Sequence, residues 1–391
     1  METHIPIPES FSISVANADL ADLRRRLDGV RWPAQAAVAP WSHGADLGYM
    51  KSLVAHWRDR YDWRHWERRL NHFTGCRVAI GGKRVHVLVE PGSGRAPLPL
   101  LLLHGWPGSL VEFLDVIEPL AHPERFGGRV EDAFTVVVPS LPGFGFSDAP
   151  DTPLTPVDIA QTLSTLMGPV LGYRRYAVQG GDWGGIVGSW MALNHPDGIA
   201  ALHLNGLGLS GGHPRPEPAD DPLTPEELDW LERDAARRAG HMAYQQIQGT
   251  EPQTLAYGLT DSPAGLAAWI VQRFHDWTVR GSDGPPPFDM DHLLTNVMLY
   301  WLGGINAPNW LYISLVDGTA RRVGPGRRIM VPTGFTFCPD DNIVPPPDRW
   351  LSRVFANIVH RRDAPRGGHF FAFEQPDLFI ETVRTFFRNY R

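Results

Sequence analysis

The sequence GGDWGG at residues 180–185 constrains the fold of this chain more than any other stretch. A short apolar run typical of a strand precedes it at residues 176–178, and a helix-like apolar run follows it at residues 186–193. A strand that turns sharply into a helix requires small residues around the turn, because a Cβ atom there would collide with the backbone. The spacing Gly-x-Asp-x-Gly, with Gly180 and Gly184 around Asp182, therefore predicts an elbow that exposes its central residue.

The residue at the centre of this elbow decides the chemistry that it can support. A Ser at such a position needs a base before it can attack an ester, whereas a carboxylate, with a reference pKa of about 4, is already ionised at neutral pH. Asp182 can therefore attack an electrophilic alkyl carbon directly and form an alkyl ester on the protein. Epoxides and alkyl halides are substrates of this kind. The alternative is a glycine-rich turn between a strand and a helix that contains Asp by coincidence.

Apolar runs of strand length surround the elbow in the sequence. Residues 98–103 form the continuous run LPLLLL, and residues 134–138 form another, as expected for buried parallel strands. A helical pattern at residues 156–171 separates the second run from the strand that leads to Asp182. Strands that alternate with helices predict an α/β fold with a doubly wound, mainly parallel sheet, whose reactive groups lie at the carboxyl ends of its strands.

Changes in pattern divide the chain into four parts. We expect a leading segment over residues 1–95, the first part of an α/β core over 96–210, an inserted helical cap over 211–325 and the second part of the core over 326–391. The leading segment has helical apolar spacing and a hairpin signal at Gly81-Gly82, and we expect it to wrap and brace the rest. A Pro-rich stretch at residues 213–225 predicts a linker into the cap.

An ester on Asp182 must be hydrolysed, which requires a base and a group that orients the base. The chain supplies Asp341 and His369 after the cap, each following a predicted late strand. The order nucleophile, acid, histidine is that of an α/β hydrolase. In this interpretation His369 takes a proton from water, and Asp341 holds the imidazole and stabilises its charged form. Asp340 is a weaker candidate for the acid.

The segment HGWP at residues 104–107 follows the first core strand and predicts an anion-binding pair of backbone groups. The N–H groups of Trp106 and Trp183 are the expected oxyanion hole, since Pro107 has no N–H to donate. We interpret His104 as a structural residue that holds this loop.

Together these stretches resemble the α/β-hydrolase-fold epoxide hydrolases, specifically the microsomal and juvenile-hormone type with its N-terminal segment. The motifs that carry the resemblance are YDWR at 61–64, HGWPGS at 104–109, GGDWG at 180–184, DSPAGLAA at 261–268, VPTGF at 331–335 and RGGHF at 366–370. They extend over most of the chain. The resemblance implies an α/β-hydrolase fold with a cap and the conversion of an epoxide to a vicinal diol.

The resemblance also implies two cap tyrosines whose hydroxyls hold and protonate the epoxide oxygen. By local motif these are Tyr244 and Tyr312, although the neighbours of Tyr312 lack the charged residues usual in the family. Asp341 is a second departure, because microsomal-type members usually carry Glu there. Asp at this position is common in the soluble branch.

Two other functions remain open at this stage. A haloalkane dehalogenase also carries Asp at the elbow, but it typically has Asn where Trp106 stands here. A catalytically silent binding protein of the same fold would be expected to lack one of Asp182, Asp341 and His369. Both alternatives are weaker than an epoxide hydrolase.

Composition and charge limit the classes of partner and cofactor expected for this protein. A net charge of −7 and the lack of a long basic run argue against nucleic acid. No Cys, His and carboxylate residues have metal-ligand spacing, so we expect neither metal nor cofactor. The N-terminus has no signal-peptide pattern, no apolar stretch has membrane-spanning length, and two cysteines form no disulfide framework, so a cytoplasmic enzyme without a membrane anchor is expected. The 14 Trp residues are compatible with a bulky aromatic epoxide, and the chain is compatible with a homodimer.

Overall fold

A computed structural model describes residues 7–211, 222–239, 241–278 and 284–391. The described residues form one nine-stranded sheet with the order β1-β2-β3-β5-β4-β6-β7-β8-β9. The strands are β1 (Glu9–Ser10), β2 (Thr74–Ile80), β3 (Lys83–Glu90), β4 (Leu98–Leu103), β5 (Phe134–Pro139), β6 (Tyr176–Gly181), β7 (Ile199–Asn205), β8 (Thr333–Phe337) and β9 (Ile358–Asp363). All strands from β5 to β9 in the spatial order pair in parallel, which confirms the predicted α/β-hydrolase fold.

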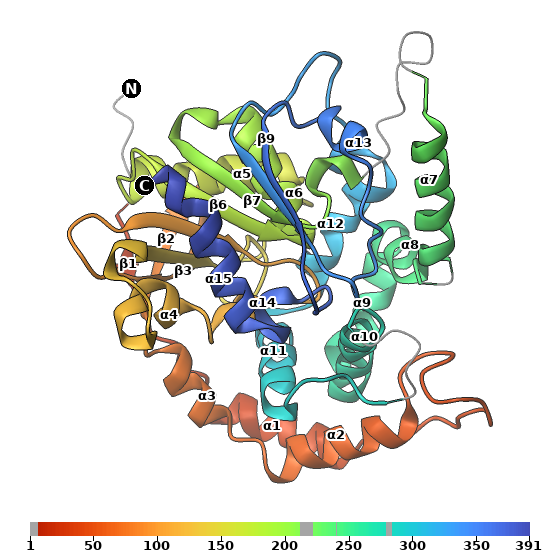
Figure 1. The fold of residues 1–391 in the computed structure, drawn as a ribbon. Helices are drawn as coiled ribbons and strands as arrows, with labels where there is room; N and C mark the ends of the chain where they lie inside the picture. The colour runs from red at the N-terminus through yellow and green to blue at the C-terminus, as the bar shows by residue number, and fades with distance from the viewer. Residues whose placement is uncertain (1–6, 212–221, 240, 279–283) are drawn as a thin grey trace.

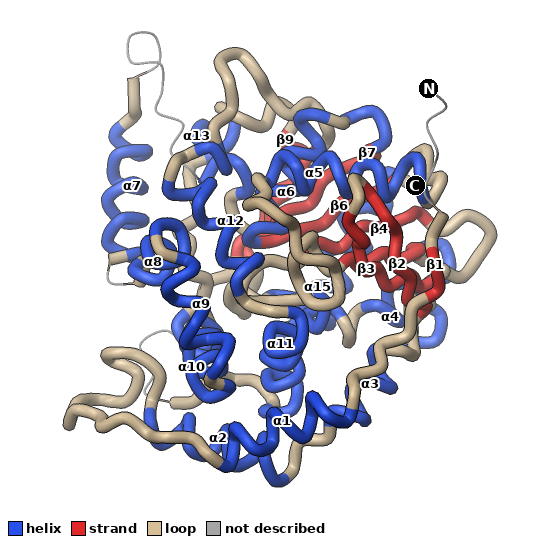
Figure 2. The backbone as a smooth tube through the Cα atoms, turned by 180° about the vertical axis from the view of Figure 1, so that it is seen from behind, coloured by secondary structure: helices blue, strands red, loops and turns tan. Residues whose placement is uncertain are grey.

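Helices cover both faces of this sheet (Figures 1 and 2). One face carries α5 (Pro156–Thr165) and α6 (Asp182–Asn194), and the other carries α4 (Ile117–Ala121) and α15 (Pro376–Phe387). Two short helices, α13 (Asp348–Ser352) and α14 (Phe371–Glu374), belong to the second part of the core. The strands that contact α6 are buried on both faces, with every residue of β4 except Pro99 buried, which explains their continuous apolar runs.

The helix predicted at residues 156–171 ends earlier as an α-helix. Thr155 and Asp158 form a capping box at its start, and Pro156 occupies the first turn, where its missing N–H costs nothing. The α-helix ends at Thr165, and residues Leu166–Val170 continue as a π-turn. Pro169 lies in that turn, and Pro cannot donate the backbone hydrogen bond that an α-helix would require.

The cap is helical, as expected from its pattern. Its helices are α7 (Pro225–Arg238), α8 (Ala243–Thr250), α9 (Pro252–Asp261), α10 (Pro263–Asp276), α11 (Met290–Gly303) and α12 (Asn306–Val316). They lie over the carboxyl ends of the central strands (Figure 1). Most of the predicted linker, residues 213–221 of 213–225, lies outside the described residues.

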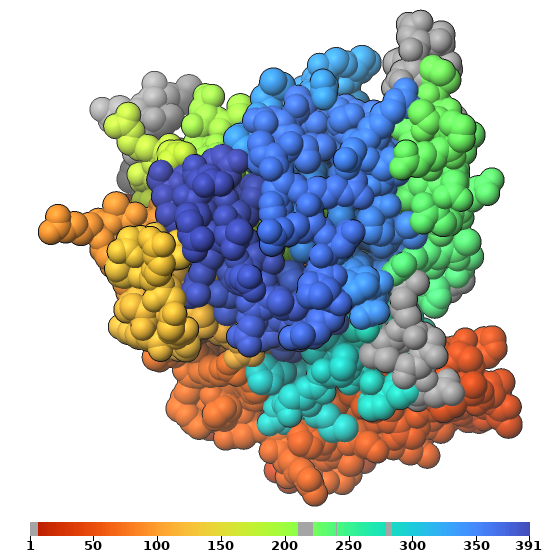
Figure 3. All heavy atoms as spheres, in the orientation of Figure 1, coloured from red at the N-terminus to blue at the C-terminus, as the bar shows by residue number. Residues whose placement is uncertain are grey.

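The leading segment contributes to two parts of the molecule. Its helices α1 (Asn17–Asp28), α2 (Leu47–Asp59) and α3 (Trp63–Leu70) run beneath the cap, where they form one edge of the molecule (Figure 3). Side chains join the two: Arg26 donates to Asp261 at 2.7 Å, and the hydroxyls of Tyr61 and Thr295 lie 3.0 Å apart. The hairpin β2–β3 instead extends the central sheet, since β3 pairs antiparallel with β5.

No helix among the described residues is both long and apolar enough to cross a membrane.

Candidate active site

The elbow after β6 has the strained geometry that its sequence predicts. Asp182 has a φ of 50°, in the left-handed region that non-glycine residues rarely occupy. A Cβ atom on Gly180 would lie 2.5 Å from the Gly184 carbonyl oxygen, and one on Gly184 would lie 2.1 Å from the Leu103 carbonyl oxygen. These two glycines therefore let α6 pack directly against the ends of β6 and β4, with the Asp182 side chain presented between them.

The Asp182 carboxylate is held by backbone donors. The Trp106 N–H donates to Oδ1 at 2.8 Å, and the Trp183 N–H also donates to the carboxylate. A Cβ atom on Gly105 would lie 2.3 Å from Asp182 Oδ1, so only glycine fits beside the carboxylate there. Burial alone would raise the pKa of Asp182, but His369 and the two N–H groups lower it below its ordinary value. Asp182 is therefore ionised at neutral pH.

The structure brings His369 and Asp341 to the same place. His369 Nδ1 lies 3.0 Å from Asp341 Oδ1, and its Nε2 lies 3.5 Å from Asp182 Oδ2. Burial alone would lower the pKa of His369, but the two carboxylates on either side raise it well above its ordinary value. Asp341 is buried, whereas Asp340 is half-buried and its N–H donates to the Gly367 carbonyl oxygen at 3.1 Å. Of these two adjacent residues, Asp341 is the one whose carboxylate contacts the imidazole.

A half-buried carboxyl that no sequence motif indicated holds the loop around His369. Glu374 accepts hydrogen bonds from the Gly368 and Phe370 N–H groups, both at 2.9 Å, while the His369 N–H donates to the Trp277 carbonyl oxygen at 3.1 Å. Burial raises the pKa of Glu374 to about 8. The backbone on both sides of the imidazole is thus fixed by one side chain from α14.

The two predicted cap tyrosines face the elbow. Tyr244 lies in the first turn of α8 and stacks on Trp106 with ring centroids 5.2 Å apart, and Tyr312 on α12 contacts Trp183 edge-on at 5.1 Å. The two tyrosine rings are themselves 5.6 Å apart. Burial and the nearby Asp182 raise the pKa of Tyr244 to about 12, and burial raises that of Tyr312 well above its ordinary value. Both therefore stay protonated and can donate.

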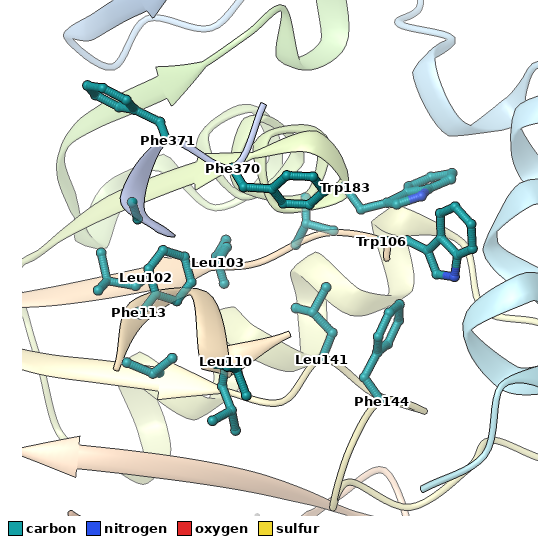
Figure 4. Close-up of a cluster of buried hydrophobic side chains, with 14 of the residues drawn as sticks. Leu102, Leu103, Trp106, Leu110, Phe113, Leu141, Phe144, Trp183, Phe370 and Phe371 are labelled. Atoms are coloured by element: carbon teal, nitrogen blue, oxygen red, sulfur yellow. The ribbon is translucent and has the colours of Figure 1, made fainter. Parts of the chain in front are cut away.

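Other aromatic residues complete the wall between cap and core. Figure 4 shows the indoles of Trp106 and Trp183 beyond the end of the strand that carries Leu102 and Leu103, on the side of the cap helices, with Phe113 next to Leu102. Trp277 from the end of α10 contacts the His369 ring at 4.6 Å. Tyr300 is not a further proton donor of this kind, because its hydroxyl donates to the Gly108 carbonyl oxygen at 2.6 Å.

His104 has the structural position expected of it. Its Nδ1 contacts the Gly105 carbonyl oxygen at 3.0 Å, and its Nε2 accepts from the Leu141 N–H at 3.2 Å. Burial lowers the pKa of His104 to about 4, so the ring is neutral and joins the loop after β4 to the loop after β5.

Two small cavities meet at the nucleophile. The cavity on the cap side, of about 50 Å³, is lined by apolar residues and by the polar side chains of Asp182, His369, Tyr244, Arg238, Arg321, Gln245 and Asn342. The cavity on the core side, of about 20 Å³, is lined by Asp182 and His369 and by residues of β4, β6 and the turn at Leu110–Phe113. Among the described residues, the two linings share only Asp182 and His369.

The described residues contain no group of three or more His, Cys, Asp or Glu side chains placed to hold a metal ion.

Comparison with known proteins places the whole chain. Residues 8–113 match the family described as "Epoxide hydrolase N terminus", and residues 99–255 match the "alpha/beta hydrolase fold" family. Epoxide hydrolase 1 of Oryctolagus cuniculus is 32% identical over 96% of this chain and 88% of its own length. A relative from Stigmatella aurantiaca, whose name provisionally assigns it as an epoxide hydrolase, is 39% identical over 97% of this chain and 85% of its own.

Solved structures agree with the sequence relatives. The epoxide hydrolase of Aspergillus niger superposes with a TM-score of 0.83 at 28% identity, covering 98% of this chain and 97% of that one. The juvenile hormone epoxide hydrolase of Bombyx mori superposes with a TM-score of 0.81 at 28% identity, covering 98% of this chain and 94% of that one. The similarity therefore includes the leading segment and the cap as well as the core.

Proposed function

The chain belongs to the epoxide hydrolases of the α/β-hydrolase fold, and from this premise we propose that it converts a small-molecule epoxide to a vicinal diol through an ester on Asp182. The observation that carries the proposal is one carboxylate that touches the Trp106 N–H and lies 3.5 Å from His369, with Tyr244 across the cap-side cavity and Tyr312 against the ring of Trp183. An ionised nucleophile opposite phenol donors can open a strained cyclic ether, because the carboxylate attacks carbon while a phenol donates to the departing oxygen.

In the first step a carboxylate oxygen of Asp182 attacks one epoxide carbon, and the bond between that carbon and the ring oxygen breaks. The ring oxygen leaves as an alkoxide, a poor leaving group unless a donor meets it. Tyr244 and Tyr312 donate to this oxygen, which takes a proton and becomes the first hydroxyl of the diol. No proton has to be removed from the nucleophile, because Asp182 is already ionised.

In the second step water attacks the carbonyl carbon of the ester. His369 takes one proton from the water, and the Trp106 and Trp183 N–H groups hold the oxyanion that forms. The bond between this carbon and the alkyl oxygen then breaks, and the second diol oxygen takes a proton from His369. The second proton of the water leaves the Asp182 carboxyl and returns to the tyrosine that protonated the ring oxygen. Asp182 thus regains its carboxylate with one oxygen from water, and Asp341 keeps the imidazole oriented throughout.

The charges around His369 link the two steps. In the free enzyme the carboxylates of Asp341 and Asp182 both raise the pKa of His369. Ester formation removes the charge on Asp182, so the pKa of His369 falls and the ring becomes available as a base. A larger fraction of His369 is therefore unprotonated in the ester than in the free enzyme.

The aromatic cluster of Trp106, Tyr244 and Tyr312, of which Tyr244 lines the cap-side cavity, supports an epoxide with an aromatic-contacting substituent. We also propose that the enzyme acts in the cytoplasm, as a monomer or as a homodimer. Sedimentation at several concentrations would distinguish the monomer from the homodimer.

A single turnover in H₂¹⁸O tests the two-step scheme. With enzyme in excess over a styrene-oxide-type probe, the first diol released carries ¹⁶O at both hydroxyls, because the new oxygen comes from Asp182. The label then appears in the protein and enters diol in later turnovers. A first diol that contains ¹⁸O contradicts the scheme, and bromide release from haloalkanes without diol formation would favour a dehalogenase.

A further inference from the structure

One carboxyl near the nucleophile has no part in the steps above. Glu112 lies in the turn at Leu110–Phe113 that follows the HGWP loop, between buried apolar neighbours. Glu112 itself keeps some accessible surface, and its side chain lines the core-side cavity with Asp182 and His369. Its carboxyl accepts from the Ser109 N–H, and no side chain in the described ranges donates a hydrogen bond to it. A polar group in such a position would be expected to have a further partner.

The backbone is shaped to admit this carboxyl. A Cβ atom on Gly108 would lie 1.4 Å from Glu112 Oε1, so any other residue at position 108 would displace the carboxyl from its place. Gly108 is fixed in turn by Tyr300, whose hydroxyl donates to its carbonyl oxygen at 2.6 Å. The loop that supplies Trp106 to the nucleophile thus also makes room for Glu112.

The cavity has the size and the polarity for water. Its volume of about 20 Å³ is enough for about one water molecule. The buried Gln179 side chain also lines it, and Gln179 Oε1 has no hydrogen-bond partner among the described residues. Two acceptors, Glu112 and Gln179, therefore surround a water-sized space that opens on Asp182 and His369. The cap-side cavity, which contains Tyr244, offers the space for the epoxide instead.

We propose that Glu112 holds the water that hydrolyses the Asp182 ester, so that epoxide and water reach the nucleophile from separate cavities. The water donates one proton to His369 Nε2 and the other hydrogen bond to the Glu112 carboxyl, which leaves its lone pair for the ester carbon. The proton then follows the route given above, from His369 to the departing alkyl oxygen. This inference rests on the proposed function, because it assigns a role within the second step.

The protonation state of Glu112 fits this role. Burial, with a contribution from Asp182, raises the pKa of Glu112 to about 8, so at neutral pH the free enzyme carries the neutral acid. A neutral carboxyl has both a donor and an acceptor oxygen and can hold a water without adding a charge beside Asp182. Gln has the same shape and the same two functions, whereas Leu fills similar space with neither.

The test separates the two chemical steps in Glu112→Leu and Glu112→Gln, with Glu118→Leu on α4 as a matched control outside the cavity. Rapid mixing of excess styrene oxide with enzyme gives the alkylation rate from the burst, and mass spectrometry gives the fraction of protein that carries the adduct. We expect Glu112→Leu to alkylate within about twofold of wild type but to hydrolyse the ester on the order of 10- to 100-fold more slowly, so that the adduct accumulates. Glu112→Gln should restore hydrolysis to within about threefold, and Glu118→Leu should resemble wild type.

Three outcomes would overturn the proposal: hydrolysis by Glu112→Leu at the wild-type rate, an equal loss of both steps, or a loss in Glu112→Gln as large as in Glu112→Leu. The alkylation burst also reports that each variant is folded. Failure of the proposed function is recognised separately, because wild type and His369→Gln would then show no adduct at all.

Discussion

At the scale of single residues, the site depends on how one carboxylate is surrounded. Asp182 meets backbone donors on one side, the imidazole on another and the cap tyrosines across a cavity. The tyrosines act in the first step of the proposed reaction, and the backbone donors and the imidazole act in the second. Substitutions can therefore be assigned to one step or the other, and the kinetics of the two steps are the natural readout.

Replacing His369 by Gln should leave the first step working and block the second. The ester should accumulate to one adduct per protein, with hydrolysis slowed on the order of 10³-fold, because no base remains to take the proton from water. Intact-protein mass spectrometry after mixing with styrene oxide gives the adduct, and peptide mapping should locate it on Asp182. Asp182→Asn is the control and should give none. Rapid diol release from His369→Gln would contradict the assignment of the base.

Replacing Tyr244 or Tyr312 by Phe should slow the first step. Each variant loses one donor to the ring oxygen, so alkylation should fall on the order of 10- to 100-fold, and the double variant should fall further. The burst rate measures this loss directly. Tyr257→Phe, at a side chain with 72% exposure, is the control and should behave as wild type. A normal burst in the double variant would show that the ring oxygen takes its proton elsewhere.

The sequence allowed part of this site to be anticipated. Asp182 and His369 lie in glycine-bordered motifs, and such motifs depend on local geometry that a sequence displays. The sequence distinguishes less clearly between Asp341 and Asp340 as the acid that contacts His369. The two adjacent residues share a motif and differ only in which side chain turns inward. Glu112 and Glu374 were not predicted. A sequence shows an acid in an apolar turn, but it does not show which residues the fold brings around that acid. Gly105 and Gly108 are also visible in the sequence, but the sequence does not show that a side chain at either position would collide with a carboxyl group.

At the scale of elements, the packing of α6 against β4 and β6 positions the nucleophile. This packing requires residues without a side chain at the contact. Two neighbouring glycines at the start of α6 differ in how closely an added Cβ atom would approach its nearest neighbour. A Cβ on Gly184 would lie 2.1 Å from the Leu103 carbonyl oxygen, whereas one on Gly185 would be no closer than 3.5 Å to its nearest neighbour, the Gly180 carbonyl oxygen. The first contact is with backbone and cannot be relieved by a rotamer change.

Gly184→Ala should therefore destabilise the protein by about 3 kcal/mol or more and abolish activity, because α6 must move away from the strand ends. Gly185→Ala should be neutral or stabilise by up to about 1 kcal/mol, since Ala favours a helix over Gly. Urea unfolding of the two variants measures the difference. Equal stability of the two proteins would show that α6 does not contact β4 in the way described.

Local patterns predicted most elements, but not how they pair. The hairpin β2–β3 was evident from Gly81-Gly82 between apolar strands, and both glycines have positive φ. Its pairing with β5 was not, because β4 intervenes in the sequence and the order of strands is a long-range property. The expected leading segment thus contributes two strands and a short third one to the sheet of the core.

At the scale of the whole molecule, buried histidines should make stability depend on pH. His86 and His203 are fully buried, and burial lowers the pKa of each to about 3. Between pH 6.5 and about 3 the unfolded chain therefore binds protons at these rings that the folded protein does not. Each ring accordingly lowers the free energy of unfolding as the pH falls below 6.5, by about 1.4 kcal/mol per pH unit.

His203→Gln tests this effect at one site. The variant loses the 3.0 Å contact with the Thr336 hydroxyl and should be less stable at pH 7. On transfer from pH 7 to pH 5, however, its free energy of unfolding should fall by about 2 kcal/mol less than that of wild type. Urea denaturation at both pH values gives the comparison, and the exposed His43→Gln variant should keep the wild-type dependence. An unchanged dependence in His203→Gln would mean that this ring is protonated in the folded protein.

The core-side cavity also has a consequence for selectivity among attacking molecules. A chamber with room for about one water molecule favours water over methanol and larger alcohols, which in free solution compete well for esters and epoxides. In mixed aqueous alcohol the enzyme should still release only the diol, with no hydroxy ether, as chromatography of the products would reveal. In this scheme the protein selects water over alcohols by the volume of the core-side cavity, while the epoxide occupies the cap-side cavity.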